Sequence, residues 1–189
     1  LREGETLAEQ LNDDRRRGLV CAQMTLIHSL LGELDEAHAS GTRALAIALA
    51  LGDLGLRVLT TTFLEVVHHH RGEYERVVEL ATDNLTALPA DWIYGLGSTA
   101  PASVYDRVWL VMSLAQLGRF VEATEYEAEA IRLAEPTQHA FTVGLAHWAA
   151  SMPQLLRGNW AKARSLIERW IAVARTGNVV LHLSWAVAS

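Results

Sequence analysis

Apolar and small residues recur along the chain at fixed distances from four glycines. Gly32, Gly72, Gly118 and Gly158 stand in the similar segments LGELDEA, RGEYERV, LGRFVEA and RGNWAKA, and they are 40, 46 and 40 residues apart. A large apolar residue follows each glycine by two positions, and a small or apolar residue follows it by five. Self-similarity at such a spacing predicts one supersecondary unit repeated four times.

Downstream of each glycine, the apolar positions have the spacing of an α-helix. They stand five, thirteen and sixteen residues after the glycine: Ala37, Val77, Ala123 and Ala163; Leu45, Leu85, Ile131 and Ile171; Ala48, Leu88, Ala134 and Ala174. Because successive helical residues are rotated by about 100°, we expect these three positions to share one helical face.

Upstream of each glycine, a second apolar stripe indicates a preceding helix. Its members stand thirteen and six residues before the glycine: Leu19, Leu59, Tyr105 and Leu145; Leu26, Val66, Met112 and Met152. Each unit is therefore predicted to be a helix, a tight turn at the glycine and a second helix. Glycine suits the left-handed backbone position that ends a helix. Since one such hairpin cannot bury its apolar faces alone, neighbouring hairpins must stack.

The predicted fold is all-α: antiparallel helix pairs stacked into a right-handed superhelix, with about ten helices including partial ends. We expect one array over residues 1–189, with repeats at about 14–52, 53–91, 99–137 and 138–177. Residues 1–13 match the second helix of a hairpin, and 178–189 match a partial first helix. We therefore expect a fragment of a longer protein that self-associates through its truncated ends.

An inserted loop over 89–103 separates the second and third repeats. Its sequence, PADWIYGLGSTAPAS, contains two prolines and two glycines and accounts for the 46-residue spacing. Proline stops helices, and glycine favours loop.

Composition narrows the class of protein. A single cysteine, Cys21, excludes an internal disulfide framework and is typical of a reducing, cytoplasmic compartment. No apolar run is long enough for a membrane helix, so we expect no membrane partner. The net charge is −6, with −10 in residues 1–143 and +4 in residues 144–189. An acidic chain disfavours a nucleic-acid partner.

The segment LGRFVEATEYEAEAI resembles the tetratricopeptide repeat. The family's turn glycine, following aromatic residue and later alanine appear as Gly118, Phe120 and Ala123. The family's leading tryptophan pattern is absent. The spacing also exceeds the family's length of about 34 residues, which implies longer helices.

A longer stretch, from ALAIALALGDLGLRVLTTTFL to LHLSWAVAS, is similar to the C-terminal helical repeats of large bacterial signalling proteins. Those proteins carry a class III adenylate/guanylate cyclase domain and an ATPase domain before the repeats. The resemblance implies a regulatory or scaffolding part of such a protein, without cyclase activity here. The segment around Lys162, the only lysine, is not a phosphate-binding loop.

No pattern in the chain indicates catalysis or a cofactor. The run His68, His69 and His70 cannot converge on one metal, because adjacent helical side chains point about 100° apart. His28 precedes His68 by one repeat, and both stand four residues before a turn glycine. We therefore expect a packing or surface role for these histidines, no metal site and no enzyme activity.

Aromatic residues give the one candidate binding surface. Tyr105, Trp109 and Trp148 fall on predicted first helices, which line the concave face of such superhelices, and Trp92 and Tyr94 fall in the inserted loop. These rings either anchor a ligand or peptide or fill the core between repeats.

The sequence thus predicts a non-catalytic interaction or regulatory module within a multidomain signalling protein. Its partner would be a protein, a peptide or a flanking domain of the same chain. The alternative is a small-molecule sensor that uses the aromatic-rich concave face.

Overall fold

The computed structural model describes residues 2–88 and 98–180, and all regular structure in these ranges is helical. The chain divides into two compact units, Leu1–Asn84 and Leu85–Ser189. The all-α prediction is therefore confirmed for the described residues. The single superhelical array remains a prediction.

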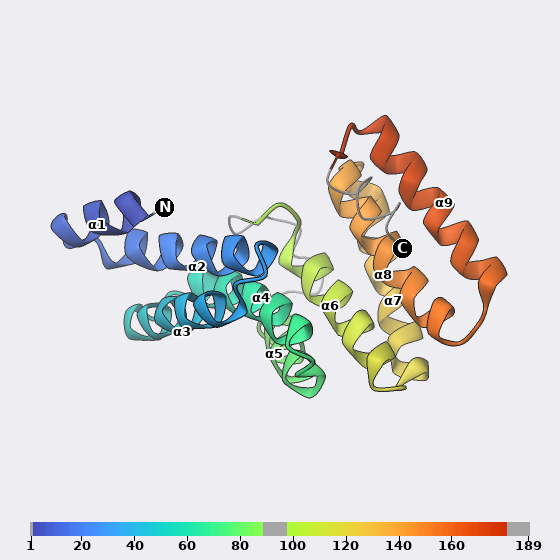
Figure 1. Ribbon diagram of the computed structural model, residues 1–189, viewed down its shortest axis with the longest axis horizontal. Helices are drawn as coiled ribbons and strands as arrows, with labels where there is room; N and C mark the ends of the chain where they lie inside the picture. The colour runs from blue at the N-terminus through green and yellow to red at the C-terminus, as the bar shows by residue number, and fades with distance from the viewer. Residues whose placement is uncertain (1, 89–97, 181–189) are drawn as a thin grey trace. The chain divides into compact units, whose positions relative to one another are not determined.

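The N-terminal unit is built from consecutive helices that pack on their neighbours (Figure 1). Its helices are α1 (Arg2–Gln10), α2 (Asp14–Leu30), α3 (Leu34–Leu51), α4 (Leu54–His70) and α5 (Tyr74–Ala87), the last of which crosses the unit boundary. Helix α1 packs on α2, α2 pairs with α3, and α4 contacts both. Asp53 begins α4 as its N-cap, because its carboxylate accepts the backbone N–H of Leu56 at 2.9 Å.

The C-terminal unit contains two further hairpins. Its elements are α6 (Ala102–Gln116), α7 (Phe120–Ala134), the 3₁₀ turn η1 (Glu135–Thr137), α8 (Ala140–Leu156) and α9 (Trp160–Thr176). Helix α6 pairs with α7, α8 packs on both, and α9 pairs with α8. The predicted partial helix over 178–189 lies mostly outside the described residues, as does most of the inserted loop.

The predicted turn glycines adopt the left-handed backbone conformation. Gly32, Gly72, Gly118 and Gly158 have φ angles of 79°, 76°, 74° and 71°. The residue after each glycine donates its N–H to the carbonyl five positions earlier, as Glu33 does to His28 at 2.9 Å. This hydrogen bond is the helix-ending Schellman pattern, so the four turns are confirmed.

The junctions between successive hairpins repeat the same geometry. Asn12, Gly52 and Asn178 have φ angles of 52°, 63° and 53°, so the three junctions share the left-handed, helix-ending conformation. Gln138, at φ 51°, holds the matching position 20 residues after Gly118. The sequence does not predict this helix end, because glutamine rarely adopts the left-handed conformation.

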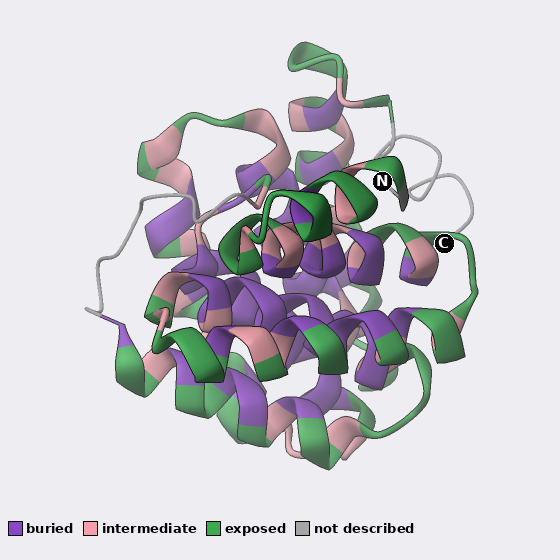
Figure 2. Ribbon diagram, turned by 90° about the vertical axis from the view of Figure 1, so that its left-hand side faces the viewer, coloured by how far each residue is buried: buried purple, intermediate pink, exposed green. Residues whose placement is uncertain are grey.

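The buried face of each second helix differs from the prediction by one residue. The positions five and sixteen after the glycine are buried in all four repeats, whereas those at thirteen are only half-buried. The third fully buried position is at twelve: Ala44, Asn84, Ala130 and Trp170. Position twelve lies only about 20° from position five around the helix, whereas thirteen lies about 80° away. Figure 2 shows buried residues following such faces along the helices.

Close packing of α3 depends on Gly41. A β-carbon at this position would lie 2.4 Å from Leu64 Cδ2 of α4 and 3.1 Å from Thr25 Cγ2 of α2. Glycine to alanine normally stabilises a helix by up to about 1 kcal/mol. Here we expect Gly41→Ala to destabilise the N-terminal unit by about 1–3 kcal/mol through overpacking, as measured by urea unfolding.

Gly4→Ala is the matched control for this substitution. Gly4 lies in α1, and its added β-carbon would meet only Val20 Cγ2 at an ordinary 3.6 Å. This variant should be neutral or slightly more stable. Equal stability changes for the two variants would contradict the close approach of α3 to α4.

Candidate functional site

Four aromatic rings form a continuous ladder through the C-terminal unit. Tyr105 and Trp109 lie on α6, Trp148 on α8 and Trp170 on α9. The ring centroids of Tyr105 and Trp109 are 6.3 Å apart, those of Trp109 and Trp148 are 5.8 Å apart, and those of Trp148 and Trp170 are 6.1 Å apart. These separations are typical of interacting aromatic pairs. The structure therefore brings together three of the predicted site residues and adds Trp170.

Burial places this ladder in the core. Tyr105 and Trp109 are 5% and 4% exposed, Trp170 is fully buried, and Trp148 is half-buried. The rings bury large apolar surface against one another, which stabilises the contact between three helices. Trp92 and Tyr94 lie outside the described residues, so the predicted binding role of the five aromatic residues stays a prediction.

Trp160 is more exposed than the residues at the equivalent position of the other repeats. The repeat places it with Leu34, Tyr74 and Phe120 at a turn-packing position, and those three residues are half-buried. Trp160 instead leaves 69% of its surface exposed. Trp160 is therefore far more exposed than its counterparts in the other repeats, and it is the most exposed of the described tryptophans.

A buried polar network links α4 to α5 in the N-terminal unit. Thr61 Oγ1 donates to Asn84 Oδ1 at 2.7 Å, and Asn84 Nδ2 donates to Glu65 Oε1 at 3.3 Å. Asn84 and Glu65 are both completely buried. Buried polar groups are stable only when hydrogen-bonded, so Asn84 fixes how α5 packs on α4.

A second network lies in the C-terminal unit around Glu127 of α7. Its carboxylate accepts from Lys162 Nζ at 2.9 Å and from Gln154 Nε2 at 3.1 Å. Glu127 is 5% exposed, and its buried charge is compensated by Lys162 of α9 and hydrogen-bonded by Gln154 of α8. This arrangement accounts for Lys162 as a structural residue.

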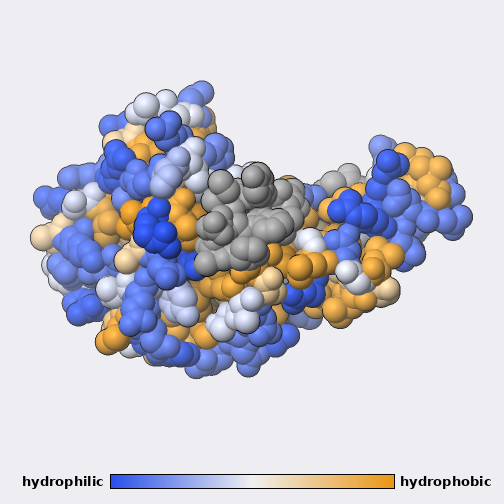
Figure 3. Space-filling view, turned by 180° about the vertical axis from the view of Figure 1, so that it is seen from behind, coloured by the Kyte–Doolittle hydropathy of each residue, from blue (hydrophilic) through white to orange (hydrophobic). Residues whose placement is uncertain are grey.

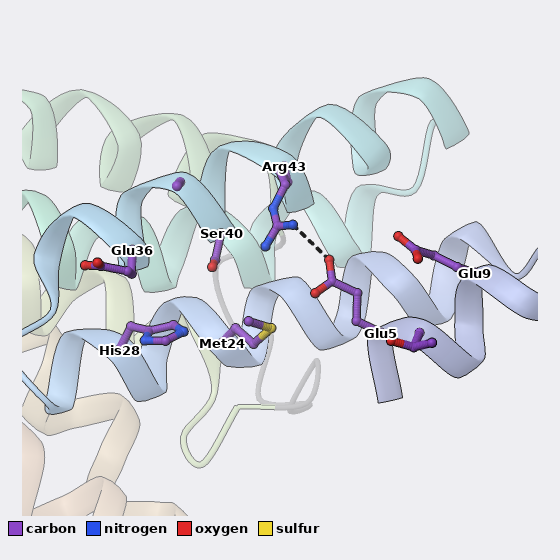
Figure 4. A pocket seen from close by; sticks show the side chains of 9 residues that line it. Glu5, Glu9, Met24, His28, Glu36, Ser40 and Arg43 are labelled. Carbon is purple, nitrogen blue, oxygen red and sulfur yellow. Dashed lines mark ion pairs between the residues drawn. The ribbon is translucent and has the colours of Figure 1, made fainter. Parts of the chain in front are cut away.

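A polar groove of about 470 Å³ opens between α1, α2 and α3 (Figure 4). Glu5 and Glu9 come from α1, His28 from α2, and Glu36 and Arg43 from α3. Arg43 Nη1 pairs with Glu5 Oε1 at 3.0 Å across the groove. The groove is mainly acidic and carries no arrangement of nucleophile and base.

Cys21 is buried and hydrogen-bonded to Glu5, one of the residues that line this groove. Its thiol is 1% exposed and donates a hydrogen bond to Glu5 Oε1 at 3.4 Å. Burial, reinforced by the Glu5 carboxylate, raises the pKa of Cys21 to about 11. Because the thiolate is the nucleophile, this cysteine is a packing residue at neutral pH.

A second groove of about 300 Å³ lies beside α1 and is apolar. Leu7 of α1, Leu11 directly after α1, and Leu19 and Val20 of α2 line it. Leu7 and Leu11 are more than half exposed. Apolar residues accordingly reach the surface at the end of the N-terminal unit that carries α1 (right in Figure 3).

The repeated histidines make the same contact in consecutive hairpins. His28 Nδ1 lies 2.5 Å from Glu33 Oε2, and His68 Nδ1 lies 2.5 Å from Glu73 Oε2. Each pair spans a glycine turn, so the predicted equivalence of His28 and His68 is confirmed. The ring of His38 on α3 stands 5.5 Å from that of His68, edge to face.

Acid should weaken the N-terminal unit through the histidines of α4. Burial lowers the pKa of His69 from its ordinary 6.5 to about 4, with a smaller effect of His70 beside it. Burial also lowers the pKa of His68, although Glu73 acts in the opposite direction. Since the folded pKa lies below the unfolded value, stability is complete above pH 6.5 and falls toward pH 4. We expect a loss of about 2 kcal/mol between pH 7.5 and about pH 5.

Urea unfolding followed by far-UV circular dichroism at the two pH values measures this loss. His69→Gln should remove most of it. His139→Gln, at an exposed position in the C-terminal unit, should leave it unchanged. A pH dependence that survives in His69→Gln would show that other groups cause it.

An ion-pair cluster lies beside a groove of about 550 Å³ at the end of α9. The Glu135 carboxylate accepts from buried His147 Nε2 at 2.9 Å and pairs with Arg169 Nη2 at 3.3 Å. The hydrogen bond from His147, followed by the charge of Arg169, lowers the pKa of Glu135. Glu135 and Arg169 line the groove together with small and apolar residues. The cluster ties η1 to α8 and α9.

The described residues supply no other candidate chemistry. Over 2–88 and 98–180, no group of three or more histidine, cysteine or acidic residues could hold a metal ion. None of the helices in these ranges is both long and apolar enough to cross a membrane. No protein-family model matches the chain, and no curated protein matches it.

Proposed function

We propose that the chain is a non-catalytic helical-repeat module that binds a protein, a peptide or a flanking domain. In this proposal its hairpins belong to a tetratricopeptide-like array that winds into a right-handed superhelix. Stacked hairpins of this kind offer extended surfaces and are suited to interaction rather than catalysis.

One observation carries the proposal: the same hairpin geometry occurs at four glycines. Each turn glycine has a positive φ angle, and the residues five and sixteen positions later are buried in every repeat. This periodicity supports repetition of one packing unit. Function is inferred from the architecture by analogy, since a fold by itself does not fix a function.

The resemblance to bacterial cyclase-associated repeats gives the proposal a context. In that context, the module would regulate or position the cyclase or ATPase domains of a larger signalling protein. The packing of the aromatic ladder favours a structural role for its rings over a small-molecule pocket, because Tyr105, Trp109 and Trp170 are buried against neighbouring helices.

A thermal-shift screen of the purified chain against nucleotides and metabolites tests this function against that of a sensor. The interaction module predicts no saturable shift with any small molecule and no turnover of ATP. A saturable shift with one compound class would favour the sensor. ATP hydrolysis by the chain alone would make it an enzyme.

A further inference from the structure

Three large apolar side chains are exposed at the turn end of the C-terminal unit. Val121 is 78% exposed at the start of α7, Leu156 is 48% exposed at the end of α8, and Trp160 is 69% exposed at the start of α9. We refer to these three residues as the apolar tip. Single exposed apolar residues are ordinary, whereas a group of them marks an interaction surface.

A cation–π contact holds the elements of the apolar tip together. The guanidinium carbon of Arg157 lies 5.8 Å from the ring centroid of Phe120. Arg157 follows Leu156, and Phe120 precedes Val121. The contact therefore brings the start of α7 against the turn between α8 and α9, where Trp160 begins α9.

Uncompensated positive charge borders the apolar tip. Arg157 and Arg164 make no ion pair within residues 2–88 and 98–180, and Arg164 lies one helical turn after Trp160. Nearby carboxylates are mostly engaged, since Glu122 pairs with Arg119 at 2.7 Å and Glu127 pairs with Lys162. The acidic exceptions in this part of the structure are Glu125, one turn after Val121, and Glu168, one turn after Arg164 and farther from the tip.

The start of α9 also differs from the starts of the other second helices. The first turns of α3, α5 and α7 each contain an acidic side chain, and the first turn of α9 contains none. Acidic side chains normally complement the positive end of the helix dipole. The first turn of α9 can therefore receive a carboxylate from a binding partner, and Arg157, Arg164 and the exposed Trp160 lie beside it.

We propose that the apolar tip docks an acidic peptide segment of a protein partner. A large apolar side chain of the segment packs on Trp160, Leu156 and Val121, and its carboxylates pair with Arg157 and Arg164. Exposed tryptophan and arginine are the residue types that dominate binding energy at interfaces. This inference rests on the proposed interaction function and names the class of partner.

Fluorescence anisotropy with a synthetic peptide tests the proposal on the full chain. The probe is a fluorescein-labelled peptide of glutamates with leucines spaced along one helical face. We expect saturable binding that weakens as salt rises. A probe with lysine in place of glutamate, and one with alanine in place of leucine, should each bind at least about tenfold more weakly.

Variants of the chain locate the site. Trp160→Ala should weaken binding at least about tenfold, and the double variant Arg157→Gln and Arg164→Gln should weaken it and flatten its salt dependence. Leu49→Ala, at a 63% exposed position on α3, is the matched control and should bind as the parent does.

Three outcomes would overturn the proposal. The first is no saturable binding of the acidic probe, and the second is equal binding by Trp160→Ala. The third is loss of self-association in Trp160→Ala, seen by analytical ultracentrifugation without any effect on the probe, which would make the tip a contact between copies. Failure of this probe would leave the proposed interaction function standing, because a separate experiment tests that function. In that experiment, photoreactive residues placed on both units capture a binding partner covalently.

Discussion

Replacing Trp170 with alanine should lower the free energy of unfolding of the C-terminal unit by about 3–5 kcal/mol. Trp170 is completely buried on α9, and its ring ends the ladder at 6.1 Å from that of Trp148. Removing the indole leaves a cavity between α8 and α9 in addition to the lost transfer free energy. Urea unfolding followed by far-UV circular dichroism measures the effect.

The same helix provides the control for this substitution. Trp160 stands ten residues earlier on α9 and is 69% exposed. Surface substitutions usually change stability by no more than about 0.5 kcal/mol, so Trp160→Ala should fold almost as well as the parent. If the two variants lost equal stability, the assignment of Trp170 to the core and Trp160 to the surface would be wrong.

Asn84→Ala should destabilise the N-terminal unit by about 2–4 kcal/mol. Alanine occupies the equivalent position in two other repeats, as Ala44 and Ala130, so the smaller side chain is compatible with the fold. The cost arises because completely buried Glu65 loses the hydrogen bond that the amide donates, whereas Thr61 keeps its hydrogen bonds to the carbonyls of Arg57 and Val58. Losing one hydrogen-bond partner of a buried polar group costs about 1–3 kcal/mol, and more when the group is charged.

Asp83→Ala, at the exposed neighbouring position on α5, is the control and should be close to neutral. Urea unfolding of both variants at neutral pH compares them directly. A second variant, Asn84→Asp, should be at least as unstable as Asn84→Ala, because it places a second carboxylate against Glu65. Near-parental stability of Asn84→Ala would show that the network contributes nothing.

The turns of this fold could be predicted from sequence because their requirement is local. A residue with positive φ ends each first helix, and glycine meets that requirement at the lowest cost, as at Gly32 and Gly158. Gln138 was missed because glutamine rarely adopts this conformation, so its residue type gives no signal for it. Gln138 directly follows the η1 turn, which the Glu135–His147 hydrogen bond ties to α8.

The buried face of the second helices was harder to predict, because the most deeply buried position is not always the most hydrophobic one. The central position is small in two repeats, where Ala44 and Ala130 occupy it, polar in the second (Asn84) and large in the fourth (Trp170), so no single residue type marks it. The larger Leu45 and Ile131 fit the apolar repeat, although they lie at the edge of the buried face and are only half-buried. The core registers of the first helices were predicted in part: Leu59, Val66, Tyr105, Met112 and Leu145 are buried as expected, whereas Leu19, Leu26 and Met152 are only half-buried.

Candidate site residues were the least predictable part. The repeat pattern assigns every aromatic residue the same role at the same position, yet Phe120 is half-buried and Trp160 is exposed. Exposure depends on which neighbouring helix covers a position, and the pattern within one repeat does not contain that information. The absence of an acidic residue in the first turn of α9 was a sequence signal that could have drawn attention to Trp160.

Photo-crosslinking tests the central claim, that this chain is an interaction module, most directly. A photoreactive phenylalanine analogue would replace exposed residues of both units, among them Leu7, Leu49 and Val121, in the full-length gene product within its native cells. We predict a covalent adduct with a protein or with a flanking domain, and saturable binding of that component once purified. No adduct at any position, together with a saturable small-molecule shift of the purified chain, would contradict the account.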